Sequence, residues 1–185
     1  MKPFRIREAA PADIGEKGEG GIRDLYNAAR RHERSEGRSP LAPPQYGSWV
    51  GAMERQAGGK PANQVLVAED TKGNIVGFAL AHHGKNLEHS TIGKLVIDPE
   101  YQGQGMGRKL LEKIQIASRQ QGKNEIRVCA EHGEGRASEF YQRLGFEVEG
   151  RYTTDGGIRV DKLVCPTRLS GHTAALAASN QPRQR

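Results

Sequence analysis

Three glycines that alternate with other residues just before a helical pattern constrain the fold more than any other feature of the sequence. They are Gly103, Gly105 and Gly107, within the stretch PEYQGQGMGRKLLEKI at 99–114. A glycine inside such an element destabilises the chain by roughly 0.5–1 kcal/mol relative to alanine. The spacing therefore indicates either that the backbone adopts positive φ angles here, or that a ligand approaches so closely that a Cβ atom would block it.

The residues after these glycines predict a helix with one apolar face. The apolar residues that share this face are Met106, Leu110, Leu111, Ile114 and Ala117, whereas Ile116 falls outside it. The amides of the first helical turn have no acceptor within the helix, and they carry a partial positive charge. A phosphate or pyrophosphate is the natural ligand at such a position.

Two familiar phosphate-binding patterns do not fit these residues. The dinucleotide fingerprint G-x-G-x-x-G fails because Arg108 stands at the third glycine position. The acidic residue expected about 20 positions later is also missing, since Arg127 is there. The P-loop pattern G-x-x-x-x-G-K-[ST] does not occur in the chain.

The pattern that does occur is Gln102-x-x-Gly105-x-Gly107, with KLVIDPEY before it at 94–101 and ASEFYQRLGF after it at 137–146. This combination resembles the GCN5-related N-acetyltransferase (GNAT) superfamily. The resemblance implies that the loop binds the pyrophosphate of acetyl-CoA through backbone amides. It also implies that the preceding strand pairs with the pantetheine arm, and that a helix tyrosine faces the thioester sulfur.

Carried over position by position, the resemblance assigns roles to particular residues. Those implied to bind the pyrophosphate are Gly103, Gln104, Gly105, Met106, Gly107 and Arg108. Those implied to lie along the pantetheine arm and the acetyl carbonyl are Leu95, Val96 and Ile97. Tyr141 falls at the tyrosine position and is expected to protonate the departing thiolate, with Ala137 as the small residue one turn earlier.

No general base carries over from the family pattern. Glu134 replaces the asparagine that many members carry ahead of the tyrosine, and Thr91 and Cys129 stand where some members have a catalytic glutamate. Glu88 is the candidate base, within a cluster that also contains His82, His83 and His89. For each of these residues taken singly, a polar side chain in an exposed turn is the favoured interpretation.

The remaining pattern predicts an α/β fold with one mixed sheet. Strands are expected at 4–9, 63–70, 75–83, 90–98, 124–130, 146–152 and 158–165. Helices are expected at 21–34, 46–56 and 135–145, besides the one after the glycines. This order, β-α-α-β-β-β-α-β-α-β-β, fits the GNAT-like acyl-CoA N-acyltransferase fold as a single domain over 1–168. Residues 169–185 lack a periodic apolar face and are expected to form a flexible tail.

Composition excludes several other classes of protein. Half of the net charge of +6 lies in the last twenty residues. The basic stretch at 29–38 is interrupted by Glu33 and Glu36. Charge alone therefore does not indicate a nucleic-acid binder. Two cysteines are too few for a disulfide framework. No apolar run suits a membrane span or a signal peptide, and the expected location is cytoplasmic. The spacing H-x4-E-H at 83–89 matches no zinc-protease motif, so no metal is expected.

The expected activity is transfer of an acetyl group from acetyl-CoA to a primary amine by direct attack in a ternary complex. The acceptor stays open: a small amine or amino acid, a protein amine, or the aminoacyl end of a charged tRNA, which the basic tail mildly favours. The alternative is a non-catalytic acyl-CoA-binding or regulatory module, favoured by the missing base and opposed by Tyr141. Tyr46 and Trp49 either line the acceptor pocket or anchor the second helix. A monomer or a homodimer is expected.

Overall fold

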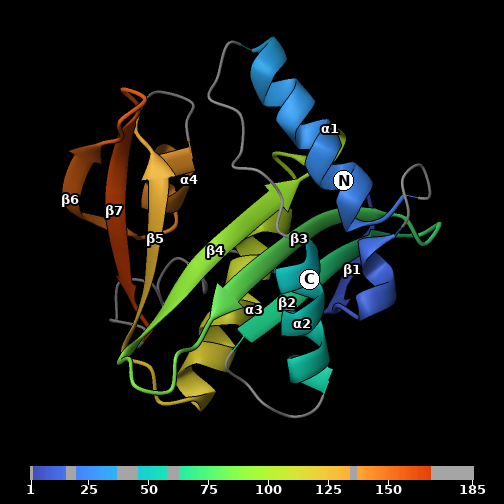
Figure 1. Ribbon diagram of the computed structural model, residues 1–185, viewed down its shortest axis with the longest axis horizontal. Helices are drawn as coiled ribbons and strands as arrows, with labels where there is room; N and C mark the ends of the chain where they lie inside the picture. The colour runs from blue at the N-terminus through green and yellow to red at the C-terminus, as the bar shows by residue number, and fades with distance from the viewer. Residues whose placement is uncertain (1, 16–19, 37–45, 58–62, 134–136, 168–185) are drawn as a thin grey trace, which may run out of the picture.

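One mixed seven-stranded sheet organises the chain. The computed structural model describes residues 2–15, 20–36, 46–57, 63–133 and 137–167 (Figure 1). In chain order the elements are β1 (Phe4–Glu8), the 3-10 helix η1 (Pro11–Ile14), α1 (Ile22–Ser35), α2 (Tyr46–Ala57), β2 (Asn63–Asp70), β3 (Ile75–His82), β4 (His89–Ile97), the 3-10 helix η2 (Pro99–Tyr101), α3 (Met106–Gln120), β5 (Glu125–Glu131), α4 (Ala137–Arg143), β6 (Glu147–Thr153) and β7 (Arg159–Pro166). The predicted order of strands and α-helices is confirmed, and the structure adds two short 3-10 helices.

The sheet divides at the boundary between β4 and β5. Its strand order is β1-β2-β3-β4-β5-β7-β6, and every neighbouring pair is antiparallel except β4 and β5, which are parallel. These two strands pair only over 89–91 and 125–127, after which β4 stays with β3 and β5 stays with β7. The strands therefore diverge, as Figure 1 shows. We call the diverging segments, 92–97 of β4 and 128–131 of β5, the β4–β5 fork.

Helices cover both faces of the sheet. Figure 1 shows α1 and α2 on one face and α3 on the other. The cluster under α3 and α4 takes buried residues from both helices and from β2 to β5 and β7, whereas α1 and α2 pack on a second cluster over β2 and β3. In that second cluster Tyr26, Trp49 and Phe78 form a group of aromatic contacts, with ring centroids 5.1 to 6.1 Å apart. Most of the apolar face predicted for α3 is buried: the buried residues are Met106, Leu110, Leu111 and Ile114, whereas Ala117 is partly exposed and Ile116 is exposed.

A bulge in β4 decides which of its side chains face α3. Leu80 pairs with Lys94 and Ala81 with Ile92, so Gly93 is the extra residue between them. A Cβ atom at Gly93 would lie 3.0 Å from the His82 imidazole. After the bulge Leu95 and Ile97 pack against the α3 cluster, while Val96 belongs to the α1–α2 cluster. The predicted pantetheine strand therefore presents its side chains to both faces.

Several predicted features lie outside the described residues. They are the tail expected at 169–185 and Glu134, and the segment 37–45 between α1 and α2 also lies outside the described residues. Cys129 is exposed and Cys165 is buried, and both are free thiols. No helix in the described part of the chain is long and apolar enough to cross a membrane.

Candidate active site

Two of the three glycines have the positive φ angles that the sequence suggested, and both leave open space beside the backbone. Gly103 has φ of 70° and Gly105 has φ of 80°, in the left-handed region that glycine adopts without strain. Gly105 is also the N-cap residue of α3. An added Cβ atom at either residue would meet nothing within 4 Å among the described residues. The backbone at these two positions is thus both specially shaped and open to close approach.

Gly107 is a glycine for a different reason. It lies inside the first turn of α3 and is buried. A Cβ atom there would lie 2.8 Å from Cζ of Phe140 on α4. The missing side chain at Gly107 therefore permits close packing between α3 and α4, which the sequence pattern did not reveal.

Glutamine side chains hold the loop in its shape. Gln102 donates its side-chain amide to the carbonyl oxygen of Ile97, the last residue of β4, at 3.2 Å. Gln104 donates to the carbonyl oxygen of Glu100 at 3.0 Å and accepts from the backbone amide of Lys2 at 2.6 Å. These bonds tie the loop to the end of β4 and to the N-terminal segment. The loop is therefore ordered by the protein itself.

The start of α3 has the properties of an anion site. Met106 is buried and packs over Gly77 of β3, where a Cβ atom would lie 2.7 Å from its sulfur. This contact fixes the first turn, whose amides have no acceptor within the helix. Arg108 and Lys109 are exposed on the same turn and add positive charge. The six residues predicted to bind pyrophosphate are consecutive in the loop and the first turn of α3, where backbone amides and the Arg108 cation would favour an anion.

Among the described strands, none pairs with the predicted pantetheine strand on its β5 side, which we call its free edge. Leu95, Val96 and Ile97 pair on one side with Ala79, Phe78 and Gly77 of β3. Their other side faces β5, which pairs with β4 no further than Thr91. An extended ligand could therefore add to this edge as a strand does. Lys94, which the sequence did not single out, is partly buried beside these residues, and burial lowers the pKa of its amine.

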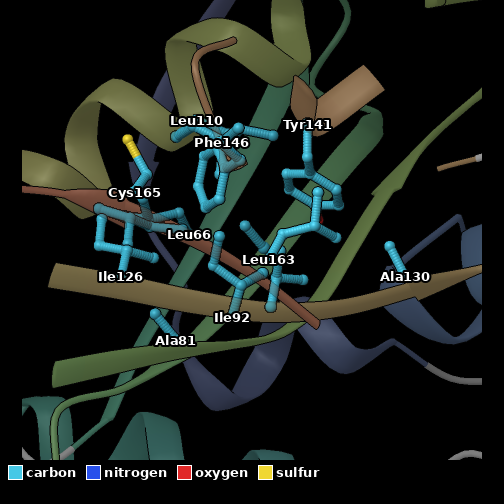
Figure 2. Close-up of a cluster of buried hydrophobic side chains, with 14 of the residues drawn as sticks. Leu66, Ala81, Ile92, Leu110, Ile126, Ala130, Tyr141, Phe146, Leu163 and Cys165 are labelled. Atoms are coloured by element: carbon cyan, nitrogen blue, oxygen red, sulfur yellow. The ribbon is translucent and has the colours of Figure 1, made fainter. Parts of the chain in front are cut away.

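Tyr141 lies beneath α4 in the cluster shared with α3. Its side chain is buried, and Figure 2 shows the ring pointing from α4 into this cluster toward Leu163. The rings of Phe140 and Phe146 lie 5.1 and 5.2 Å from it in edge-on contacts. Burial raises the pKa of the Tyr141 phenol well above its usual value. The phenol is therefore neutral, as a proton donor must be.

The buried face of α4 contains a polar residue beside Tyr141. Ala137 is exposed, and the buried residues of this seven-residue helix are Ser138 and Tyr141. The core residue one turn before Tyr141 is thus Ser138 and not the apolar Ala137, because a hydrogen bond allows the serine side chain to be buried.

That hydrogen bond belongs to a polar group centred on the buried Asp161 of β7. The Asp161 carboxylate accepts from Ser138 Oγ at 2.6 Å, from His132 Nδ1 at 2.9 Å and from Arg151 Nε at 2.6 Å. Burial alone would raise the pKa of Asp161, but the three donors outweigh it and lower the pKa to about 2. The sequence held one signal of this group: alternation along β7 puts Asp161 in phase with the buried Leu163 and Cys165.

The structure separates Glu88 from the predicted pantetheine residues Leu95, Val96 and Ile97. Glu88 precedes β4 at the closed end of the fork, where its carbonyl oxygen accepts from the amide of Asn124 at 2.8 Å. At about 3.3 Å per residue, it lies roughly 20 Å along the strand from Leu95. His83 and His89 also lie at this closed end. No group of three metal-ligating side chains lies within the described residues.

The two aromatic residues predicted for the acceptor pocket have separate outcomes. Trp49 is buried in the aromatic group with Tyr26 and Phe78, so it anchors α2 on the sheet. The side chain of Tyr46 lies outside the described residues, as does the loop at 37–45 before it.

Comparisons with known proteins agree with this geometry. Residues 61–148 match the model of a GNAT acetyltransferase domain. Over 75 residues, 40% of its length, the chain is 41% identical to GCN5-related N-acetyltransferase 2 of Arabidopsis thaliana. Over 132 residues, 64% of its length, it is 26% identical to the ribosomal protein bS18 alanine N-acetyltransferase of Escherichia coli. The matched segments span 28% and 88% of those proteins, and no more than half of the first plant relatives.

A solved structure shows the same fold along most of the chain. It is yncA, a putative acetyltransferase from Salmonella typhimurium with its cofactor acetyl-CoA. It superposes with a TM-score of 0.69 at 22% identity, covering 91% of this chain and 96% of that one.

Proposed function

Because the chain belongs to the GNAT superfamily of acetyltransferases, we propose that it transfers an acetyl group from acetyl-CoA to a primary amine by direct attack in a ternary complex. The observation that supports this most is the β4–β5 fork, which has the glycine loop at one edge and Tyr141 beneath α4 on the other side. All seven strands belong to one sheet, so we assign residues 1–168 to one acetyltransferase domain.

The glycine loop fits the diphosphate of the donor. Gly103 and Gly105 leave open space beside a backbone that a larger residue would strain. The amides from Gly103 to Arg108 would hold the negatively charged oxygens, with Arg108 adding its own charge. When bound, acetyl-CoA supplies the activated acetyl group as a thioester.

Residues at the fork would orient that group and move protons. The free edge of Leu95, Val96 and Ile97 would pair with the amide-containing arm of the donor, and one amide of this trio would polarise the acetyl carbonyl. Tyr141 would donate its phenolic proton to the departing sulfur. No described carboxylate is assigned as base, and a water molecule relaying the proton from the amine fits the site as well as a side chain.

We propose a primary amine as the acceptor and do not assign it to one class of molecule. The Escherichia coli relative is named as an alanine N-acetyltransferase of ribosomal protein bS18, and because the only amine of alanine is its α-amine, this name supports the α-amine of a protein as acceptor. Small amines and the aminoacyl end of a charged tRNA remain in the proposal as well.

A thiol-release assay tests the proposed activity. Purified protein is mixed with acetyl-CoA and, in turn, with small amines, amino acids, alanine-initiated peptides and charged tRNA, and free CoA is measured. Amine-dependent release together with acetylated product is expected for one class. Calorimetric binding of acetyl-CoA without release for any class would instead favour a non-catalytic acyl-CoA-binding module.

A further inference from the structure

We propose that Asp161 and Ser138 are positioning residues that fix the location of the Tyr141 hydroxyl by holding α4 against β7. This inference rests on the proposed role of Tyr141 as the proton donor. It concerns residues that neither the family pattern nor the comparisons assign.

The length of α4 makes it dependent on such contacts. An isolated helix shorter than about 12–15 residues is marginal in water, because the nucleation cost is not recovered. With seven residues, α4 is far below that length. Its position is therefore set by what its side chains contact, and its buried face consists of Ser138 and Tyr141.

These two side chains share one face of α4. Residues three apart in a helix are neighbours on its surface. Ser138 is fixed by its 2.6 Å hydrogen bond to Asp161, and Gln142 donates to the same serine oxygen at 3.0 Å. Tyr141 has aromatic neighbours but, among the described residues, its hydroxyl makes no hydrogen bond within the protein. On this face of α4, the hydrogen bond that holds the helix to β7 is therefore made by Ser138.

Asp161 is itself held firmly. Both carboxylate oxygens accept hydrogen bonds: Oδ1 from Arg151 of β6, and Oδ2 from Ser138 and from His132, which directly follows β5. The Asp161 side chain is 1% exposed. One carboxylate therefore connects the end of β5, both final strands and α4. Because mispositioning of a catalytic group by 1 Å can lower a rate by about 100-fold, this connection matters to the proposed chemistry.

The first test observes Tyr141 directly in the ligand-free protein. Tyrosine labelled with 13C at Cζ gives one resonance for each of the five tyrosines, and Tyr141→Phe identifies the one at 141. Ser138→Ala is expected to shift or broaden that resonance. Ser118→Ala is the matched control, since Ser118 is a buried helix serine that bonds within its own helix, to Ile114, at 2.8 Å. A Tyr141 resonance unchanged by Ser138→Ala would overturn the proposal.

The second test is a double-mutant cycle on the acetyl transfer reaction with an alanine-initiated peptide, or on hydrolysis of acetyl-CoA if that peptide is not a substrate. Ser138→Ala should lower kcat about 10-fold to 100-fold while the KM for acetyl-CoA stays within about twofold. Ser138→Thr, which keeps the hydroxyl, should restore most of the rate. In a Tyr141→Phe background, Ser138→Ala should have no further effect.

The outcomes separate this inference from the proposed function. If Tyr141→Phe lowers kcat and Ser138→Ala multiplies that loss, Ser138 acts by another route, and the positioning role alone fails. If Tyr141→Phe keeps the wild-type kcat, the proposed acid fails, and the positioning role fails with it.

Discussion

The ring of Phe140 occupies the space that a side chain at Gly107 would need, because a Cβ atom there would lie 2.8 Å from Cζ of the ring. The first turn of α3, which is proposed to bind the pyrophosphate, therefore packs directly on the helix that carries Tyr141. The two parts of the candidate site share one contact, and a change in one is expected to affect the other.

Gly107→Ala is expected to destabilise the protein by about 1–3 kcal/mol, because the new methyl group forces the Phe140 ring to move. Urea denaturation measures this change. The double variant with Phe140→Leu shortens the ring side of the contact and should recover part of the loss. An unfolding midpoint equal to that of the wild type in Gly107→Ala would show that the ring moves without strain.

Gly105→Glu is expected to weaken acetyl-CoA binding at least tenfold, or about 1.4 kcal/mol. The substitution places a carboxylate where the donor phosphates are proposed to lie. Calorimetric titration measures the affinity, and circular dichroism checks the fold. Gly105→Ala is the control, because it shares the strain of the 80° φ angle without adding a charge. Equal affinities for the Glu and Ala variants would contradict an anion site here.

Tyr141→Phe should lower kcat by about 10²–10⁴-fold, the range typical of general acid catalysis. The ring and its contacts with Phe140 and Phe146 are kept, so stability and the KM for acetyl-CoA should change little. Since burial raises the pKa of the phenol, it stays protonated well into the alkaline range. Steady-state kinetics under conditions where chemistry limits the rate are the measurement, and a wild-type kcat would return Tyr141 to a purely structural role.

The free energy of unfolding is expected to decrease as the pH falls, because His83 is buried in its neutral form. Its side chain is 1% exposed, and burial, followed by the charges of Lys123 and His82, lowers its pKa from 6.5 to about 4. The native state thus resists protonation more than the unfolded state does. The stabilising effect is complete above pH 6.5 and is lost as the pH falls through about 4.

At about 1.4 kcal/mol per pKa unit, the full loss for His83 is about 3 kcal/mol. Urea unfolding at a series of pH values should therefore show a steeper decline for the wild type than for His83→Gln, which cannot titrate. Parallel declines in the two proteins would show that other groups govern acid stability.

Local patterns predicted the elements of this fold well, because each depends on neighbours in the sequence. The hairpin at Lys72–Asn74 has its glycine at φ of 88°, and the buried face of α3 follows its 3.6-residue period. The order of these elements along the chain followed from the same patterns and fitted the GNAT-like fold. The short helices at Pro11–Ile14 and Pro99–Tyr101 were missed, because single turns have no period to detect.

The polar parts of the candidate site were harder to predict because they assemble from distant segments. The partners of Asp161 come from β6, from α4 and from the residue after β5, and no local spacing connects them. Gly107 was explained together with its two neighbours, yet its contact is with a ring 33 positions later on another helix. Glu88 was chosen by residue type alone, and sequence could not show that it precedes the closed end of the fork.

The short parallel pairing of β4 and β5 also affects how rigidly the two parts of the sheet are joined. Within the described residues, the sheet consists of two plates, β1 to β4 and β5 to β7, joined along a seam of three residue pairs. A seam this short resists rotation less than a full ladder of hydrogen bonds would. We therefore expect the angle between the two parts of the sheet to depend chiefly on the side chains that pack between α3, α4 and the strands. We therefore expect that the length of acyl chain accepted by such a protein varies with the residues at this contact, such as Phe140. The strands themselves are expected to stay unchanged.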